Sequence, residues 1–557
     1  MKYRNELKGA MMTVAFVLLN LTAQNGNAQI TERDRPDEWE NLVYGGRFMD
    51  RFLPMPAQGP LTSDTWGAAE VKPRYIENGL EDNEWSYWGG NALLGDDGKY
   101  HLYACRWSEN AEKGHMAWPN SEVVHAVSEN SFGPYKVLET IGKGHNPEIF
   151  KLKDGRYVIY VYKGYYISEH LNGPWEYSTF KFERRDRKII EGLSNLSFAQ
   201  REDGSYLMVC RGGGIWFSET GISPYYQVTE KRVYPPVDGR FEDPLVWKTN
   251  IQYHMIVNDW LGRIAWYLRS KDGINWKVDP GEAYMPGIAT YEDGTVVEWF
   301  KYERIKMLQD ELGRATQAHF AVIDTIKWND LKSDNHSSKH ICIPLTLGRQ
   351  IELVSSEKIN ENTQSIRLKI KGENGFDPHT DIDLGTLRFG ASEEVNFGKG
   401  CKVSSTVKSG NDLIVTFDGT GNGLTQDNFV AKLLGRTSSG KLLFGYARLP
   451  WVEYIEPALS ARLPKFSKKG KGFNLEVEVQ NFGQVSSETS KIKVEYSVHG
   501  KSIEVASGIV PKLNPFQKTY VKMKCGNLVE PGIEYDVRVS IYPDEQNPVI
   551  FNGSVNF

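Results

Sequence analysis

Short apolar strands that follow tight turns recur along the first two-thirds of the chain. Four of these turn-and-strand units begin at Asp97, Asp154, Asp203 and Asn250, and a fifth begins at Asp310. In the first three units the turn is Asp-Gly, which between alternating apolar runs is the strongest short signal for a β-hairpin. The pattern therefore predicts a series of antiparallel sheets built from one repeated unit.

Each of the first four hairpins is followed by a further strand and another turn. These added segments are residues 123–135, 165–175, 215–225 and 265–276. The repeated unit is then a four-stranded sheet of about 50 to 60 residues, which is the size of a propeller blade. We therefore predict a five-bladed β-propeller over residues 81–348.

The rest of the chain predicts further β structure. Residues 29–80 contain polar and Pro-rich runs, and we expect them to form an arm packed on the propeller. Alternating strands resume after residue 351 and predict two β-sandwich, immunoglobulin-like domains, over 349–457 and 458–557. The basic run 465–471 between them is interpreted as a solvated linker. The predicted fold class is all-β.

The first 28 residues have the pattern of an export signal. A basic start is followed by the apolar stretch 11–21 and by small residues at 26–28, as in a cleavable signal peptide. We expect the protein to be exported and to be periplasmic or secreted. No later segment has the roughly 20 apolar residues that a membrane span requires, so no membrane span is predicted.

Charge and cysteine content remove several classes of partner. The net charge of −5 gives no basic patch of the kind that binds nucleic acid. The five cysteines are scattered without CxxC spacing, which argues against a zinc site and a dense disulfide framework. We expect them to be small buried hydrophobic residues. The oligomeric state is not indicated.

The starts of the five innermost strands should face the mouth of a shared funnel. Aligned by the repeat, one register position is polar in every blade and carries Asn91, Asn146, Asn195, Asp243 and Glu303. Two acids on neighbouring blades are the minimum for glycoside hydrolysis, because one protonates the leaving oxygen and the other activates water or attacks. Alternatively, Asn and Asp at these positions only cap the local backbone.

Further polar residues near these strand starts are candidates for the same site. Glu242 could replace Asp243 or perturb its pKa, but on a regular strand its side chain would point the other way. His145 could bind a sugar hydroxyl, act as an acid or be structural. Asp259 could join the acids or form a buried pair with Arg263.

The segment 106–118 interrupts the first hairpin with His and Trp residues, and we expect it to overhang the funnel as a stacking wall. Arg106 could bind an anionic group of the substrate or form a structural salt bridge. Trp85 and Trp88, just before Asn91, are candidate platforms for a sugar ring because flat aromatic faces stack on apolar surfaces.

The inner-strand starts and the Asp-Gly hairpins resemble those of five-bladed propeller glycosidases, notably glycoside hydrolase families 43 and 117. Residues 302–322 also resemble the last-blade pattern of a family-43-like group of secreted bacterial exo-glycosidases. The resemblance implies a secreted, exo-acting glycoside hydrolase that removes a terminal sugar from plant or algal oligosaccharides by inversion. Family 43 carries Asp residues on its early blades, whereas this chain has Asn91 and Asn146, so the family's catalytic assignment does not transfer.

Other interpretations remain open at this point. Some propeller glycosidases carry a divalent ion in the tunnel, but this sequence has no ligand cluster that requires one, and we predict no cofactor and no metal ligand. The three asparagines of the ring also fit a non-catalytic carbohydrate-binding propeller. The C-terminal sandwiches fit a scaffold protein at the cell surface.

Overall fold

The computed structural model describes residues 33–63, 71–188, 193–355, 357–469, 472–498, 501–525, 532–543 and 547–556. Helix is confined there to a few short turns, η1 (Asp37–Asn41), η2 (Phe48–Arg51), η3 (Gly114–Asn120) and α1 (Ser392–Val395). The prediction of an all-β fold is confirmed. The predicted export signal, residues 1–28, lies outside the described residues. Within the described part of the chain, no helix is long and apolar enough to cross a membrane.

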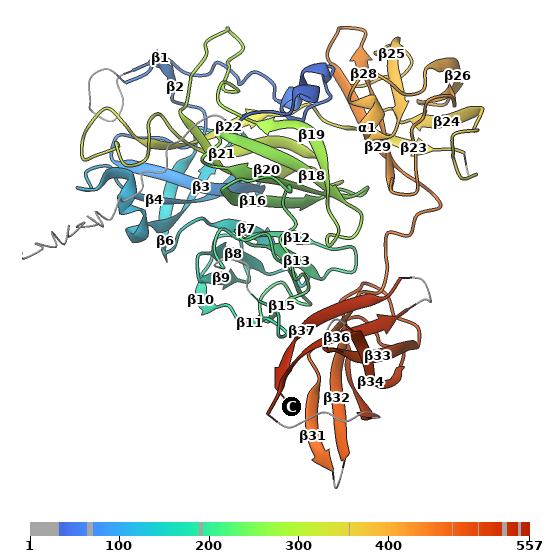
Figure 1. Cartoon of the computed structure of the whole chain (residues 1–557). Helices are drawn as coiled ribbons and strands as arrows, with labels where there is room; N and C mark the ends of the chain where they lie inside the picture. Colours follow the sequence, from blue (N-terminus) through green and yellow to red (C-terminus); the bar gives the residue numbers. More distant parts are fainter. Residues whose placement is uncertain are drawn as a thin grey trace, which may run out of the picture.

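Five successive sheets, numbered here sheets 1 to 5, follow the order of the predicted repeats (Figure 1). Sheet 1 contains β3 (Trp85–Leu94), β4 (Tyr100–Ser108), β5 (Glu122–Ser128) and β6 (Lys136–Lys143). Sheet 2 contains β7 (Glu148–Lys151), β8 (Tyr157–Val161), β9 (Gly164–Ser168) and β10 (Glu176–Thr179). Sheet 3 contains β12 (Ser197–Gln200), β13 (Tyr206–Val209), β14 (Ile215–Ser218) and β15 (Tyr225–Gln227), with β11 (Phe182–Glu183) parallel to β15.

Sheet 4 contains β16 (Phe241–Lys248), β17 (Tyr253–Asp259), β18 (Ile264–Ser270) and β19 (Lys277–Tyr284). Sheet 5 has three strands, β20 (Lys301–Gln309), β21 (Ala315–Ile323) and β22 (Ser338–Pro344). The first strands of neighbouring sheets contact one another: β3 contacts β7, β12 contacts β16, β16 contacts β20, and β20 contacts β3. The sheets are therefore arranged around a common axis, as in a propeller.

The N-terminal segment completes the last sheet. Leu80 pairs with His340 on β22, and Phe52 pairs with Leu345 just beyond the end of this strand. The segment also contains the short strands β1 (Leu61–Thr62) and β2 (Arg74–Tyr75). An uncovered edge strand exposes unpaired backbone groups, and Leu80 satisfies part of that edge while it links the beginning of the five-sheet domain to its end.

The following domain is one continuous seven-stranded sheet. Its strands are β23 (Arg349–Leu353), β24 (Ser365–Ile370), β25 (Ile382–Gly390), β26 (Val403–Ser409), β27 (Asp412–Asp418), β28 (Val430–Thr437) and β29 (Leu442–Arg448). The two halves are joined because β23 pairs antiparallel with β24 and parallel with β29. Buried residues from both halves, among them Leu368, Val415 and Leu433, share one core.

The C-terminal domain consists of two sheets around a separate apolar core. One sheet has β30 (Leu459–Ala461), β31 (Lys465–Lys469), β32 (Gly472–Asn481) and β35 (Lys518–Lys524), and the other has β33 (Ser490–Val498), β34 (Lys501–Val510), β36 (Glu534–Tyr542) and β37 (Val549–Asn556). The interpretation of 465–471 as a linker was wrong, because β31 pairs with β32. Phe466 packs against the core and anchors this strand between its lysines.

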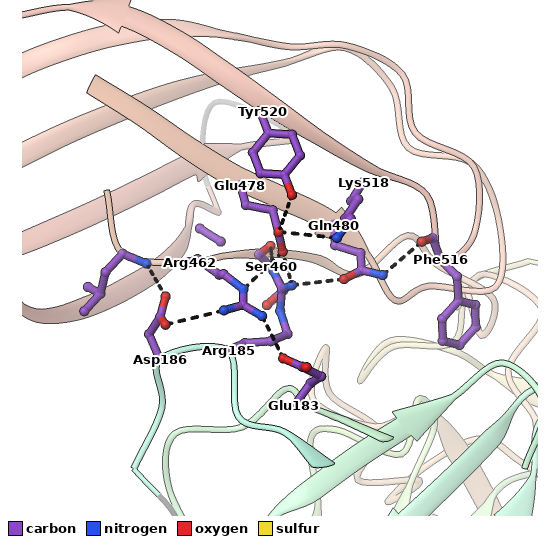
Figure 2. Close-up of polar contacts among 12 residues, drawn as sticks. Glu183, Arg185, Asp186, Ser460, Arg462, Glu478, Gln480, Phe516, Lys518 and Tyr520 are labelled. Carbon is purple, nitrogen blue, oxygen red and sulfur yellow. Dashed lines mark hydrogen bonds and ion pairs between the residues drawn. The ribbon is translucent and has the colours of Figure 1, made fainter. Parts of the chain in front are cut away.

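A buried arginine attaches the C-terminal domain to sheet 3 (Figure 2). Arg185, which follows β11, donates to Oε1 of Glu478 at 2.7 Å, to Oε1 of Gln480 at 2.9 Å and to the carbonyl oxygen of Ser460 at 2.8 Å. Arg462 of the C-terminal domain forms an ion pair with Glu183 on β11 at 3.0 Å. Each of the two domains therefore contributes one arginine to the contact between them.

Candidate functional site

The first strands of the sheets share one local distortion. In β3, β16 and β20 the register of pairing with the next strand shifts at a β-bulge. The bulges lie between Trp88 and Asn91, between Glu242 and Leu245, and between Glu303 and Lys306. Each bulge contains a residue with positive φ, namely Gly89 (62°), Asp243 (51°) and Arg304 (56°). Asn146 (57°) and Asn195 (52°) have the same conformation two residues before β7 and β12. Bulges of this kind re-aim side chains and are frequent next to active sites.

These bulges correct the register that the sequence predicts. Asp243 is equivalent in conformation to Arg304, and Glu303 is instead equivalent to Glu242. Asn91 corresponds to Leu245 and Lys306, beyond the bulge. The sequence alignment of the five strand starts by polarity assumed regular strands. It therefore gave Asn91 and Glu303 the register position of Asp243, which neither of them occupies.

The residues around the bulges form the floor of a cavity of about 370 Å³, a size typical of small-ligand sites. Predicted site residues that line it are Trp88, His145, Asn146, Asn195, Glu242, Asp243 and Glu303. Asn91, Arg106, Trp85 and Asp259 are not among its lining residues. The structure thus brings together Glu242, Asp243 and Glu303 without Asp259, and only part of the predicted binding set.

A network of buried polar side chains connects the first strands of the sheets. Glu148 on β7 forms an ion pair with Lys306 on β20, across the ring. The Ser197 hydroxyl donates to Glu148 at 3.3 Å and accepts from the backbone N–H of Val246 at 3.1 Å. Asn91 exchanges two hydrogen bonds with the backbone of Ile149, at 2.8 and 3.1 Å. Asn91 therefore ties two first strands together.

Glu242, Asp243 and Glu303 form one cluster, in which an oxygen of each carboxylate lies within 4.8 Å of the others. The expectation that Glu242 points away from Asp243 was wrong. The bulge and the positive φ of Asp243 break the alternation of the strand, so that consecutive side chains face the same cavity. This cluster is the chemical centre of the site.

Both carboxylate oxygens of Asp243 have hydrogen-bonding or ion-pair partners. Its Oδ1 accepts from the Asn195 amide at 2.9 Å and lies 3.1 Å from Nε of Arg304, while its Oδ2 accepts from the Arg304 backbone N–H at 3.3 Å. The Arg304 guanidinium also donates to the side-chain oxygen Oδ1 of Asn195 at 2.7 Å. These bonds fix the geometry of three neighbouring positive-φ residues, and leave Asp243 in a supporting position.

Glu303 is buried between two lysines. Oε2 accepts from Nζ of Lys327, and Oε1 lies 3.5 Å from Nζ of Lys301. Burial raises the pKa of Glu303, but the charges of Lys327 and Lys301 outweigh it and the net pKa is below the usual 4.5. Glu303 is therefore an ionised carboxylate at neutral pH.

The pKa of Glu242 is shifted in the opposite direction. Burial and the neighbouring Asp243 carboxylate raise its pKa to about 7, although Lys327 and Arg211 oppose the shift. Its Oε1 lies 2.6 Å from Nη2 of Arg211. Glu242 can therefore carry a proton at neutral pH, a few ångströms from an ionised carboxylate.

Aromatic side chains make the walls of the cavity, namely Trp88, Trp118, Tyr162, Trp260 and Trp328. The helix η3 supplies His115, Met116 and Trp118, so the predicted overhanging segment 106–118 does contribute to the wall. Apolar ring faces combined with convergent polar groups are the composition expected of a carbohydrate site.

His145 stands at the edge of this wall. Its Nδ1 lies 3.0 Å from the Ser121 hydroxyl, and its ring is 4.7 Å from that of Trp118. Burial, and then the charge of Arg304, lower the pKa of His145 well below 6.5. The imidazole is therefore neutral, which favours hydrogen bonding to a ligand over proton donation.

Three predicted binding residues have partners elsewhere. Arg106 pairs with Glu122 at 2.9 Å, and its guanidinium lies 4.0 Å from the centre of the Trp85 ring. Asp259 forms its ion pair with Arg33 of the N-terminal segment, whereas the sequence suggested Arg263. Arg33 is distant in sequence, and only the folded arm brings it to sheet 4.

The basic residues of the site were missed by the sequence. Lys327 and Trp328 lie on the connection between β21 and β22, residues 324–337. Like the connection 109–121 between β4 and β5, it is longer than the corresponding turns in sheets 2 to 4, and long loops over a rigid scaffold often carry function. Arg211 follows β13, and no signal in the repeat marked it.

Among the residues that the structure describes, two groups of side chains have the spacing of metal ligands. In the acidic cluster each carboxylate already has a basic partner, so the residues fit ion pairing at least as well as a cation. The second group, His319, His340 and Cys342, is fully buried in sheet 5. There Nδ1 of His319 lies 3.3 Å from Nε2 of His340 and 3.4 Å from Sγ of Cys342.

Comparison with known proteins gives likenesses of backbone only. No protein-family profile matches the sequence, and no curated protein matches it. A family 117 glycoside hydrolase of Zobellia galactanivorans has a TM-score of 0.34 and 11% identity over 53% of this chain and 89% of its own. An α-L-arabinofuranosidase of Lactobacillus brevis has a TM-score of 0.33 and 11% identity, over 46% of this chain and 90% of its own. A thermostable family-43 glycoside hydrolase has a TM-score of 0.28 and 11% identity, over 52% of this chain and 94% of its own.

The similar structures thus include the two families that the sequence resembles. Their TM-scores are too low to support a conclusion about activity. The function is therefore inferred from the site itself.

Proposed function

We propose that this protein is a glycoside hydrolase whose acid is Glu242 and whose nucleophile is Glu303. The observation that supports it is a pair of carboxylates with pKa values shifted in opposite directions inside one aromatic-walled cavity. Two neighbouring acids with separated pKa values can divide the roles of proton donor and nucleophile between them.

In the proposed reaction protonated Glu242 donates its proton to the glycosidic oxygen as the bond to the anomeric carbon breaks. Ionised Glu303 attacks that carbon and forms a glycosyl ester, and Glu242 then takes a proton from the water that hydrolyses the ester. Lys301 and Lys327 keep Glu303 ionised and orient it. Asp243 positions the strand that carries Glu242 through its bonds to Asn195 and Arg304.

The spacing of the carboxylates bears on the stereochemistry. Oxygens of Glu242 and Glu303 lie within 4.8 Å of each other. Inverting enzymes separate their two carboxyl groups by about 6.5–9.5 Å to admit a water, and retaining enzymes by about 5–5.5 Å. We therefore propose retention, in place of the inversion that the resemblance implies.

The buried polar network between the first strands supports action at chain ends. The ion pair of Glu148 with Lys306 and the bonds of Asn91 connect these strands, and we propose that the substrate enters from one side, with its terminal residue in the cavity. We propose an exo-acting enzyme on oligosaccharides of plant or algal origin, exported by the segment 1–28.

The decisive experiment incubates the purified protein with a panel of plant and algal oligosaccharides. Release of single sugars, followed by chromatography, supports the proposal, and shortening to mixed internal fragments contradicts the exo mode. Proton NMR of the first product formed distinguishes retention from inversion. If every oligosaccharide of the panel remains intact, the proposal fails.

A second candidate function is carbohydrate binding without catalysis. It is favoured by the fact that each carboxylate of the cluster is held by a basic side chain, Arg211, Arg304 or Lys327. A purely binding protein would hold an oligosaccharide for hours without cleavage. Calorimetric titration beside the hydrolysis assay separates the two functions.

A further inference from the structure

The balance of charge in the cavity is unusual for a site that cleaves a neutral sugar. Its charged lining residues, within the described part of the chain, are Arg211, Glu242, Asp243, Glu303, Arg304 and Lys327. Lys301 lies directly behind Glu303. Three lining carboxylates therefore meet three lining cations, and Lys301 adds a fourth cation 3.5 Å from Glu303. The two lining histidines, His115 and His145, are neutral because burial lowers their pKa values well below 6.5.

The imbalance grows in the state that reacts. Glu242 must carry a proton to act as the acid, which leaves the carboxylates of Asp243 and Glu303 against the four cations. The transition state of glycoside hydrolysis is itself positively charged, because it resembles an oxocarbenium ion. In a cavity shielded from water, surplus positive charge raises the energy of that state.

We propose that the terminal sugar carries an anionic group, a carboxylate or a sulfate ester, and that Arg211 binds it. This inference rests on the proposed hydrolase function and deepens it. An oxyanion on the substrate offsets the surplus charge at the moment when the positive transition state forms. It also draws the substrate into the cavity, since a positive field concentrates anions.

Arg211 is the cation best placed for this role. Its side chain is 35% exposed, against 22% for Lys327, 6% for Arg304 and 4% for Lys301. A guanidinium presents two parallel N–H groups to a carboxylate or sulfate. Because Nη2 of Arg211 contacts Glu242, a bound oxyanion would compete with this carboxylate and favour its protonated form.

The test compares three sets of oligosaccharides of similar length, ending in a uronic acid, a sulfated sugar or a neutral sugar. We expect kcat/KM for one anionic set to exceed that for the neutral set by about tenfold or more, as a charge-assisted bond between an arginine and an oxyanion allows. The two anionic sets identify the group. Raising sodium chloride from low to high concentration should increase KM for the anionic set, because salt screens the attraction.

The variant Arg211→Gln should lower kcat/KM for the anionic set by about tenfold or more, chiefly through KM. Arg232→Gln is the matched control, since Arg232 is an exposed arginine between β15 and β16 and is absent from the cavity lining. It should stay within about threefold of the wild type. Equal losses in both variants would overturn the proposal.

Failure of this inference can be separated from failure of the hydrolase function. If neutral chains are cleaved as well as or better than anionic ones, the site is a hydrolase without the proposed specificity. If anionic sugars bind in calorimetry but nothing is cleaved, the anion site stands and the hydrolase is wrong. If nothing binds and nothing is cleaved, both are wrong.

Discussion

Glu242 and Glu303 occupy the same position on neighbouring first strands: each is the last paired residue before a bulge. Glu242 pairs with Asn258 on β17, and Glu303 pairs with Ala321 on β21. One repeated backbone feature therefore presents two acids to one cavity, where their surroundings raise the pKa of Glu242 and lower that of Glu303. The two roles can be tested separately.

Removing the charge of Glu303 should stop hydrolysis. We expect Glu303→Gln to lower kcat by about a thousandfold or more, as loss of a nucleophile does, while the oligosaccharide still binds. The control is Glu311→Gln, at an exposed acid in the turn after β20. Kinetics and calorimetry on both variants provide the measurement. Normal turnover by Glu303→Gln would remove this residue from the mechanism.

The pH dependence should report Glu242. Its pKa is raised to about 7, so the acid is protonated below that pH and loses its proton above it. We therefore expect kcat/KM to fall as the pH rises through about 7. In Glu242→Gln this alkaline limb should disappear and the rate should drop by about a hundredfold or more.

The same variant has an internal control. A substrate with an activated aryl leaving group needs little protonation, so Glu242→Gln should impair its cleavage much less. An alkaline limb that persists unchanged in Glu242→Gln would assign the titration to another group.

The ion pair beneath the cavity should be important for stability. Lys306→Met would leave the buried Glu148 carboxylate without its partner, and we expect the free energy of unfolding to fall by about 3–5 kcal/mol. Adding Glu148→Gln should recover part of the loss, since the uncompensated charge is removed. Urea unfolding followed by tryptophan fluorescence measures both. Additive losses in the double variant would mean that the two residues do not interact.

Arg185 should hold the C-terminal domain against sheet 3. Arg185→Met removes the bonds from this arginine to Glu478, Gln480 and Ser460. We therefore expect faster proteolysis of the connection between the domains and a larger radius of gyration in solution scattering. Arg184→Met, at the exposed neighbouring arginine, should behave as the wild type. If the two variants have the same proteolysis rate and the same radius of gyration, Arg185 does not hold the domains together.

The repeated sheets were predictable because their signals are local. An Asp-Gly turn and the period-two alternation around it specify a hairpin within about ten residues. The strands β3 to β22 accordingly follow the predicted repeats in order. For the same reason, the sequence drew attention to the polar strand starts that contain Asn146, Asn195 and Asp243.

The site itself depends on contacts that no local pattern records. The bulges that turn Glu242 into the cavity and Asn91 out of it arise from packing of the first strands around the axis. Lys327 reaches Glu303 from a long loop, and Arg33 reaches Asp259 from the arm.

The sequence by itself determined the all-β class, the repeat and the presence of acids at the strand starts, because these follow from short-range propensity and composition. Only the tertiary structure decided which acids meet, which cations hold them and which of them carries a proton. Those properties depend on burial and on distances between residues far apart in the chain.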